Sequence, residues 1–175
     1  EVRDSGGMHY TTSENIHRAI DPLFLGQLET KLAEIIASDS YENTYERDQD
    51  LEAFRLELAN LRFLDPACGS GNFLIVSYKC IRELEIQTWQ SLRDLGSSEL
   101  PFSYIRLDQF YGIEIDDFAC DTEILSLWLA EHQMNNRFAE ELGERTNPLP
   151  LHKSGNIVCG NACRLNWDTV CPHTL

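Results

Sequence analysis

The sequence predicts an α/β domain in which three parallel strands follow an N-terminal helical segment. The first observation is a short apolar run at 61–65 that leads through a glycine turn into a long helical pattern beginning near Asn72. The second is that two further apolar runs, 110–115 and 157–159, each follow a helix or a loop. Strands that alternate with helices are typical of a parallel sheet. We place the division between the helical segment and the α/β part after residue 60, giving 1–60 and 61–175.

The N-terminal segment has the apolar spacing of helices. A helix is expected to start at Ser13, with Thr12 or Ser13 as its N-cap. Apolar residues then recur at helical spacing, namely Ile16, Ile20, Leu23, Phe24, Leu28, Leu32 and Ile35. Pro22 is expected to kink or split this helix. Residues 39–50 read as an acidic connector, followed by a short amphipathic helix with Leu51, Phe54, Leu58 and Leu61 on one face.

The α/β part alternates strands and helices. After the strand at 61–65, a helix is predicted from near Asn72 to beyond Trp89, and a polar loop lies around Gly96. The second helix is predicted over 117–135. Its apolar residues Ile124, Leu125, Leu127, Trp128 and Leu129 surround it, which predicts burial between the sheet and a neighbour. A Pro-containing loop at 146–154 precedes the third strand.

The turn at 65–73, Asp-Pro-Ala-Cys-Gly-Ser-Gly-Asn-Phe, is the strongest functional feature. Small ligands bind where the strands of an open α/β sheet end. A dinucleotide site needs a third glycine, and that position holds Leu74; the Gly-Lys-Ser/Thr triplet of a P-loop is also missing. Asp65 would repel a phosphate but suits a cationic ligand such as S-adenosylmethionine. Gly69 and Gly71 would let the backbone pass close to it. The alternative is an ordinary strand-to-helix turn.

A second acidic residue lies at the end of a predicted strand. Glu114 ends the second apolar run, 49 positions after Asp65. A carboxylate at this place in dinucleotide folds accepts hydrogen bonds from ribose hydroxyls, although the usual spacing is about 20 residues. A long first helix and a polar loop account for the excess. Glu114 is the candidate ribose ligand, whereas Asp116 is equally well explained as a helix N-cap.

These residues resemble the ordered motifs of a known family. Residues 65–73 are similar to motif I of S-adenosylmethionine-dependent adenine-N6 DNA methyltransferases, and 7–12 to their motif X. Residues 114–116 resemble motif II, and 160–162 resemble motif III. The order X, I, II, III is that of the gamma group. Residues 107–115 and 128–135 further resemble the methyltransferase part of single-chain type II (IIG/IIL) restriction–modification enzymes.

The resemblance implies a partial Rossmann-like class I methyltransferase fold that binds S-adenosylmethionine. Asp65 would meet the ammonium group, Glu114 the ribose, Ile115 and Ala162 the adenine ring, and Asn161 its edge. The other implied cofactor-binding residues are Tyr10, Thr11, Ala67, Cys68, Gly69, Gly71, Asn72 and Phe73. The family's catalytic motif, [DNS]-P-P-[YFW], would follow motif III and does not occur before Leu175. We therefore expect an excised piece that contains no catalytic residue and is inactive alone.

The net charge and the apolar pattern of the chain limit the partners that it can bind directly. The net charge of −15 has the wrong sign for a DNA-binding surface, so double-stranded DNA is expected to be held by domains outside this chain. No apolar run is long enough for a membrane span and no signal peptide opens the chain. The resemblance to restriction–modification enzymes implies the bacterial cytoplasm. Two other functions stay open: methylation of RNA or of a protein glutamine, and a non-catalytic cofactor-binding module of a phage-defence protein.

Six cysteines lack a C-x-x-C pair, which favours free thiols over disulfides. A zinc site from Cys159, Cys163, Cys171 and His173 is the alternative, but its spacing fits no common zinc motif, so no metal is expected. The first strand is expected at the edge of the sheet. It would associate there with the rest of the methyltransferase domain, or with a second copy of the chain.

Overall fold

The computed structural model describes residues 12–38, 41, 43–143 and 156–172. The N-terminal helices are α1 (Ser13–Ile20), the π-helix η1 (Asp21–Leu25), α2 (Gly26–Ala37) and α3 (Thr44–Asn60). The strands are β1 (Phe63–Asp65), β2 (Phe110–Glu114) and β3 (Asn156–Cys159). Between and after them lie α4 (Asn72–Asp94), the 3-10 helix η2 (Leu107–Gln109), α5 (Asp117–Leu142) and α6 (Trp167–Val170). No helix among these residues is long and apolar enough to cross a membrane.

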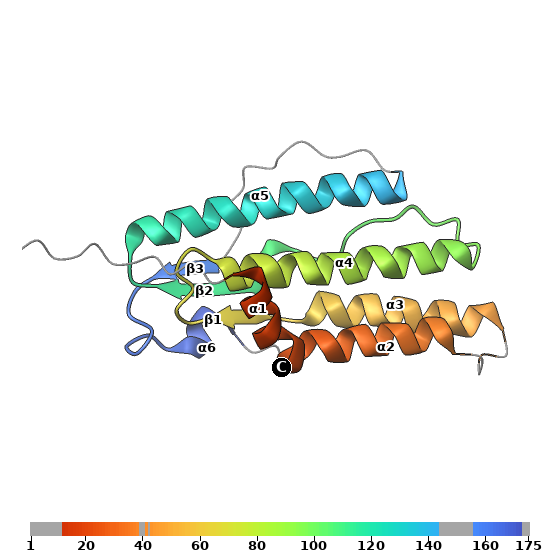
Figure 1. The fold of residues 1–175 in the computed structure, drawn as a ribbon, viewed down its shortest axis with the longest axis horizontal. Coiled ribbons are helices and arrows are strands. Elements are labelled where there is room, and N and C mark those ends of the chain that lie inside the picture. The colour runs from red at the N-terminus through yellow and green to blue at the C-terminus, as the bar shows by residue number, and fades with distance from the viewer. Residues whose placement is uncertain (1–11, 39–40, 42, 144–155, 173–175) are drawn as a thin grey trace, which may run out of the picture.

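Pro22 divides the first helical region, as predicted. Thr12 caps α1, because its hydroxyl accepts a hydrogen bond from the Asn15 amide. Pro22 has no amide hydrogen, and the helix widens into the π-turn η1, where the Gly26 amide donates to the carbonyl of Asp21. Beyond this point α2 runs in a different direction from α1 (Figure 1).

The helix α3 begins earlier than predicted. The acidic stretch 39–50 was expected to be a connector, but α3 starts at Thr44. Asn43 supplies the cap. Its side-chain oxygen accepts from the Glu46 backbone amide at 3.1 Å, and its side-chain nitrogen donates to the Glu46 carboxylate at 3.2 Å. This reciprocal pairing starts a helix whose first two turns are polar, and apolar spacing alone could not detect it.

In the described part of the chain the sheet consists of three parallel strands, as predicted, and their order is β1–β2–β3. Asp65 of β1 lies opposite Gly112 of β2, and Glu114 lies opposite Cys159 of β3. β2 therefore extends two residues beyond β1 toward the carboxyl end. β1 is shorter than expected, because Leu61 and Arg62 precede it in an irregular segment.

Long helices pack on this short sheet. α4 contacts β1 and β2, α5 contacts β2 and β3, and the two helices contact each other. Together with α2 and α3 they continue well beyond the strands, so the sheet occupies one end of an elongated molecule (Figure 1). The prediction that α5 is enclosed all round was wrong. Leu127 is buried, but Leu125 and Leu129 are 54% and 50% exposed, because α5 forms an outer edge of the molecule.

Two aromatic groups fill the interior. Near the sheet, Phe63 stacks on Phe110 at 4.8 Å between ring centroids, and Phe24 and Tyr78 pack edge-on against this pair. Farther along the helices, the buried guanidinium of Arg55 lies 3.9 Å from the centroid of Trp89 and also faces the rings of Phe102 and Tyr104.

The prediction of free thiols was wrong for one pair of cysteines. A disulfide joins Cys120 of α5 to Cys159 of β3, with 6.2 Å between their Cα atoms. The two residues are 39 positions apart. They meet because β3 pairs with β2, whose end leads directly into α5. Cys68, Cys80, Cys163 and Cys171 are free. No group of metal ligands occurs among the described residues; His173 of the alternative zinc site lies outside them.

Candidate cofactor-binding site

The glycine turn between β1 and α4 is fixed by hydrogen bonds at both ends. The carboxylate of Asp65 accepts from the Ala67 amide at 3.0 Å, and the Cys68 amide donates to the carbonyl of Ile113 in β2 at 3.1 Å. Gly69 and Gly71 have φ angles of +57° and +78°, a region that side chains disfavour. Gly71 caps α4, so the turn leads straight into the first turn of that helix.

Glu114 links the end of β2 to this turn. One carboxylate oxygen accepts from the Gly69 amide at 2.8 Å, and the other accepts from the amides of Ile115 and Asp116 at 2.8 and 3.1 Å. A carboxylate offers about four acceptor positions. One position therefore stays open for a ligand hydroxyl, and a second would open if a ligand displaced one of the amides.

Two carboxylates make the site acidic. Burial is the main cause that raises the pKa of Asp65; the Ala67 amide opposes it, and the charge of Glu114 raises it further. Residues 65–73 contain no Lys or Arg. A cationic ligand group would relieve the repulsion, whereas a phosphate would add to it.

The structure adds Glu123 of α5, which the sequence analysis missed. Its side chain is fully buried under the turn, and its carboxyl oxygen lies 2.6 Å from Cys68 Sγ. Burial raises the pKa of Glu123 to about 7; the thiol hydrogen bond opposes this, and the charges of Asp65 and Glu114 add to it. Its place on the buried face of α5, three residues after Cys120 and four before Leu127, was available from the helical spacing.

The remaining predicted residues lie around the ends of β2 and β3. Asn161 closes a turn, because its side-chain oxygen accepts from the Cys163 amide at 2.9 Å. The Gly160 amide, one residue before it, donates to the carbonyl of Glu114 at 2.7 Å, which holds Asn161 and Ala162 close to the end of β2. Ile115 is 70% exposed. Asp116 caps α5 through the Ala119 amide at 2.9 Å.

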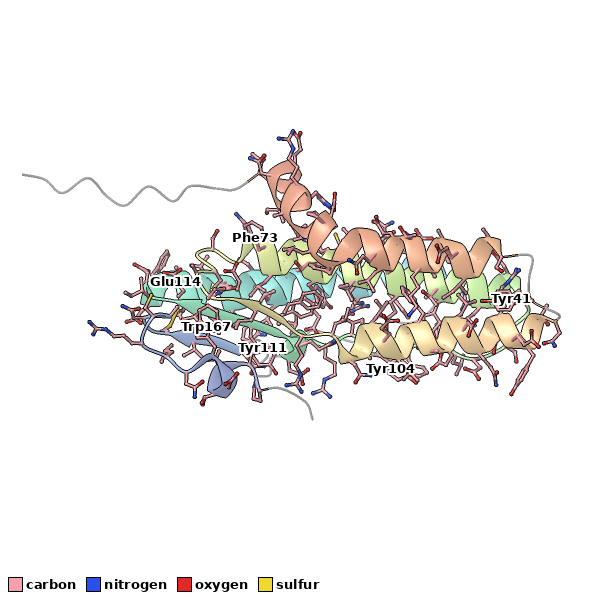
Figure 2. The ribbon with its side chains drawn as sticks, turned by 90° about the horizontal axis from the view of Figure 1, so that it is seen from below. Tyr41, Phe73, Tyr104, Tyr111, Glu114 and Trp167 are labelled. Atoms are coloured by element: carbon pink, nitrogen blue, oxygen red, sulfur yellow. A yellow bond between two sulfur atoms is a disulfide. The ribbon has the colours of Figure 1, made fainter. Side chains whose placement is uncertain are left out.

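The structure therefore brings the predicted residues of the turn, of β2 and of β3 together at the carboxyl ends of the strands. Figure 2 shows Glu114 and Phe73 at this end of the molecule, far from Tyr41 at the other. Asn72 is the first residue of α4, and Phe73 packs against the core. Tyr10 and Thr11 lie outside the described residues. A groove of about 350 Å³ beside β1 includes Asp65, Pro66 and Phe73 in its lining. A larger cavity lies at the amino ends of the strands, away from both carboxylates.

Comparison with known proteins agrees with this arrangement. Residues 41–175 match the family model described as "MmeI, DNA-methyltransferase domain". DNA methyltransferase A of Bacillus subtilis strain 168 is 44% identical over 173 residues, which are 98% of this chain and 19% of that protein. A putative type II restriction enzyme and methyltransferase of Methanocaldococcus jannaschii is 36% identical over 131 residues, covering 75% of the chain and 11% of that protein.

The fold also matches a solved structure. The type IIL restriction–modification enzyme MmeI, determined in complex with DNA, superposes with a TM-score of 0.80 and 35% sequence identity. The match covers 93% of this chain and 21% of that one. The chain thus spans about a fifth or less of the length of these relatives.

Proposed function

The chain belongs to the MmeI DNA-methyltransferase domain family, and from this premise we propose that it binds S-adenosylmethionine for methyl transfer to adenine N6 in DNA. Residues 61–175 would be the first half of the methyltransferase α/β domain, and 1–60 the motif X segment with its helices. The relatives named as methyltransferases and as restriction enzymes support a place in a restriction–modification system.

One observation carries the cofactor assignment. Asp65 and Glu114 end two adjacent parallel strands, and the Gly69 amide between them is held by Glu114 at 2.8 Å. Asp65 would face the ammonium group of the cofactor, and the open acceptor position of Glu114 would take a ribose hydroxyl. Ala67, Cys68, Gly69 and Gly71 would shape the turn around the amino-acid part.

The adenine of the cofactor would lie near the ends of β2 and β3. Ile115, with its exposed side chain, and Ala162 would contact the ring. The side-chain oxygen of Asn161 keeps an acceptor position beside its bond to the Cys163 amide, and would meet the adenine amino group. Tyr10 and Thr11 would complete the pocket.

The chemistry would then depend on positioning. The cofactor would supply a methyl group on a sulfonium, and the residues of this chain would orient that group. The target adenine would be flipped out of the duplex, because its N6 is inaccessible inside the stack. The groups that bind this base and the DNA backbone would belong to other parts of the full-length protein, which we place in the bacterial cytoplasm with its DNA substrate.

Calorimetric titration of the full-length protein with S-adenosylhomocysteine tests the cofactor assignment, with NAD as the control ligand. We expect binding of the first and none of the second. Separate incubations of labelled S-adenosylmethionine with duplex DNA, RNA or protein, followed by analysis of the labelled product, test the reaction. N6-methyladenine is the expected product. Label in RNA or protein instead would show that the substrate is one of these alternatives. Cofactor binding without any methyl transfer would favour the non-catalytic module.

A further inference from the structure

The carboxyl group of Glu123 occupies space that two glycines leave free. A Cβ on Gly71, in the turn, would lie 2.5 Å from Glu123 Cγ and 3.0 Å from its Oε1. A Cβ on Gly112, in β2, would lie 3.1 Å from the same oxygen. The side chain therefore forms a wedge between the turn and the strand. Open space surrounds Gly69, by contrast, so Gly69 but not Gly71 leaves room for a ligand.

The surroundings of this carboxyl favour its neutral form. The hydrogen bond from the Cys68 thiol to Oε2 opposes this, but Oε1 has no hydrogen-bond partner among the described residues. The charged groups that face it are the carboxylates of Asp65 from β1 and Glu114 from β2. A negative charge on Glu123 would be buried, without a cation, beside two others.

We propose that Glu123 is a positioning residue for the cofactor, which holds the Cys68–Gly71 turn in its binding shape while protonated and releases it on ionisation. Loss of the proton to solvent would leave three carboxylates around one turn. Repulsion from Asp65 and Glu114, together with hydration of the new charge, would then outweigh the hydrogen bond from the Cys68 thiol and draw Glu123 out of its place, so the turn would lose the wedge beneath Gly71. The inference rests on the proposed function, because it assigns a role at the same cofactor site.

Cofactor affinity across neutral pH tests this role in the full-length protein. We expect the dissociation constant of S-adenosylhomocysteine to rise as the pH increases through neutrality, by at most about tenfold per pH unit for one coupled proton. Glu123→Gln, which keeps the shape without the charge, should remove this dependence. Asp121→Asn, at an exposed position on the same helix, should keep it. The ligand's own ammonium group titrates equally with all three proteins. The readout is therefore the dissociation constant of each variant divided by that of the wild type at the same pH.

A purely structural Glu123 would behave differently. Glu123→Gln would then weaken binding by the same factor at every pH, and that result would overturn the proposal. A flat wild-type profile would overturn it too. Absence of binding at any pH would remove the proposed function itself and the positioning role with it, so the two failures are distinguishable.

The reactivity of Cys68 provides a second measurement that needs no ligand and no variant. Alkylation followed by site-resolved mass spectrometry compares Cys68 with the exposed, free Cys163 in the same molecule. If ionisation of Glu123 frees the turn, the labelling rate of Cys68 relative to Cys163 rises severalfold between pH 6 and 8. A constant ratio over this range would contradict the proposal.

Discussion

Glu114 Oε2 accepts a hydrogen bond from the Gly69 amide at 2.8 Å, and this bond connects the end of β2 to the turn after β1 across 45 positions of the sequence. The same carboxylate also holds the first amides after β2. Glu114 thereby shapes the turn, and one of its acceptor positions stays open.

The first prediction concerns this carboxylate. Glu114→Ala should weaken S-adenosylhomocysteine binding by at least about tenfold, because a charge-assisted hydrogen bond is worth roughly 1.5–3 kcal/mol. Glu114→Gln keeps one acceptor oxygen and should have an intermediate effect. Calorimetric titration measures both, with the exposed Asp117→Asn as control. Unchanged affinity in Glu114→Ala would refute the ribose assignment.

A pair of glycines gives the second prediction. Gly69→Ala and Gly71→Ala both place a side chain at positive φ, which costs about 1–2 kcal/mol of stability each. Only the Gly71 substitution also collides with Glu123. Urea denaturation should therefore show a larger loss for Gly71→Ala, and Glu123→Ala combined with it should cost less than the sum of the two. Equal losses for the two glycines would show that the wedge exerts no constraint.

The sequence predicted the sheet because each strand is a compact apolar run next to a clear turn or loop. The position of Asp65 and Glu114 at the ends of adjacent strands was also predictable, since each ends an apolar run. The start of α3 was missed because its first turns are polar and depend on the Asn43 cap. The far end of α5 was missed although the sequence carries its signal, since Met134, Phe138 and Leu142 continue the buried face at a spacing of four.

Contacts between distant segments could not be predicted from the sequence. Nothing local shows that Cys120 and Cys159 meet, because that depends on how β3 pairs with β2. Glu123 looked like one acid among many in an acidic chain. Helical spacing could place it on the buried face of α5, but its contacts with Cys68 and Gly112 follow from the packing of α5 against the turn and β2.

The third prediction is a pH dependence of folding. Burial raises the pKa of Glu123 from 4.5 to about 7 in the folded chain. Between these values the folded state binds more protons than the unfolded state, so stability falls as the pH rises from about 4.5 through about 7. The wild type should lose roughly 2.5 kcal/mol more than Glu123→Gln between pH 5 and pH 8. If the unfolding free energies of the two proteins changed equally with pH, the pKa of Glu123 would not be raised in the folded state.

The buried Arg55 leads to the fourth prediction. Its guanidinium is 1% exposed, stacks on Trp89 and donates to the Phe102 carbonyl at 3.0 Å. Arg55→Ala should cost about 3 kcal/mol, from the lost stack and a cavity among aromatic rings. Arg55→Lys should recover only part, because an ammonium cannot stack as a plane. The exposed Arg18→Ala should cost below about 1 kcal/mol. Similar unfolding energies for Arg55→Ala and Arg18→Ala would argue against a structural role for the aromatic group.

The free edge of β1 gives the last prediction. In the described residues β1 pairs only with β2, and the groove along its other side includes Leu23, Phe24 and Phe63. Leu23 is 72% exposed there. An unpaired strand edge next to apolar side chains favours pairing with another chain. We expect the 175-residue chain to associate with itself at high concentration, as measured by light scattering after size-exclusion chromatography.

Two lysine substitutions test whether this edge is responsible. Leu23→Lys places a charge in the groove and should shift the chain toward monomer, whereas Leu100→Lys, at a position that is 81% exposed in the loop after α4, should leave association unchanged. A wild-type chain that stays monomeric at every concentration would contradict the expectation. Equal effects of the two lysines would attribute association to general surface hydrophobicity. A selective effect of Leu23→Lys would assign it to the side of β1 where a parallel sheet can add its next strand.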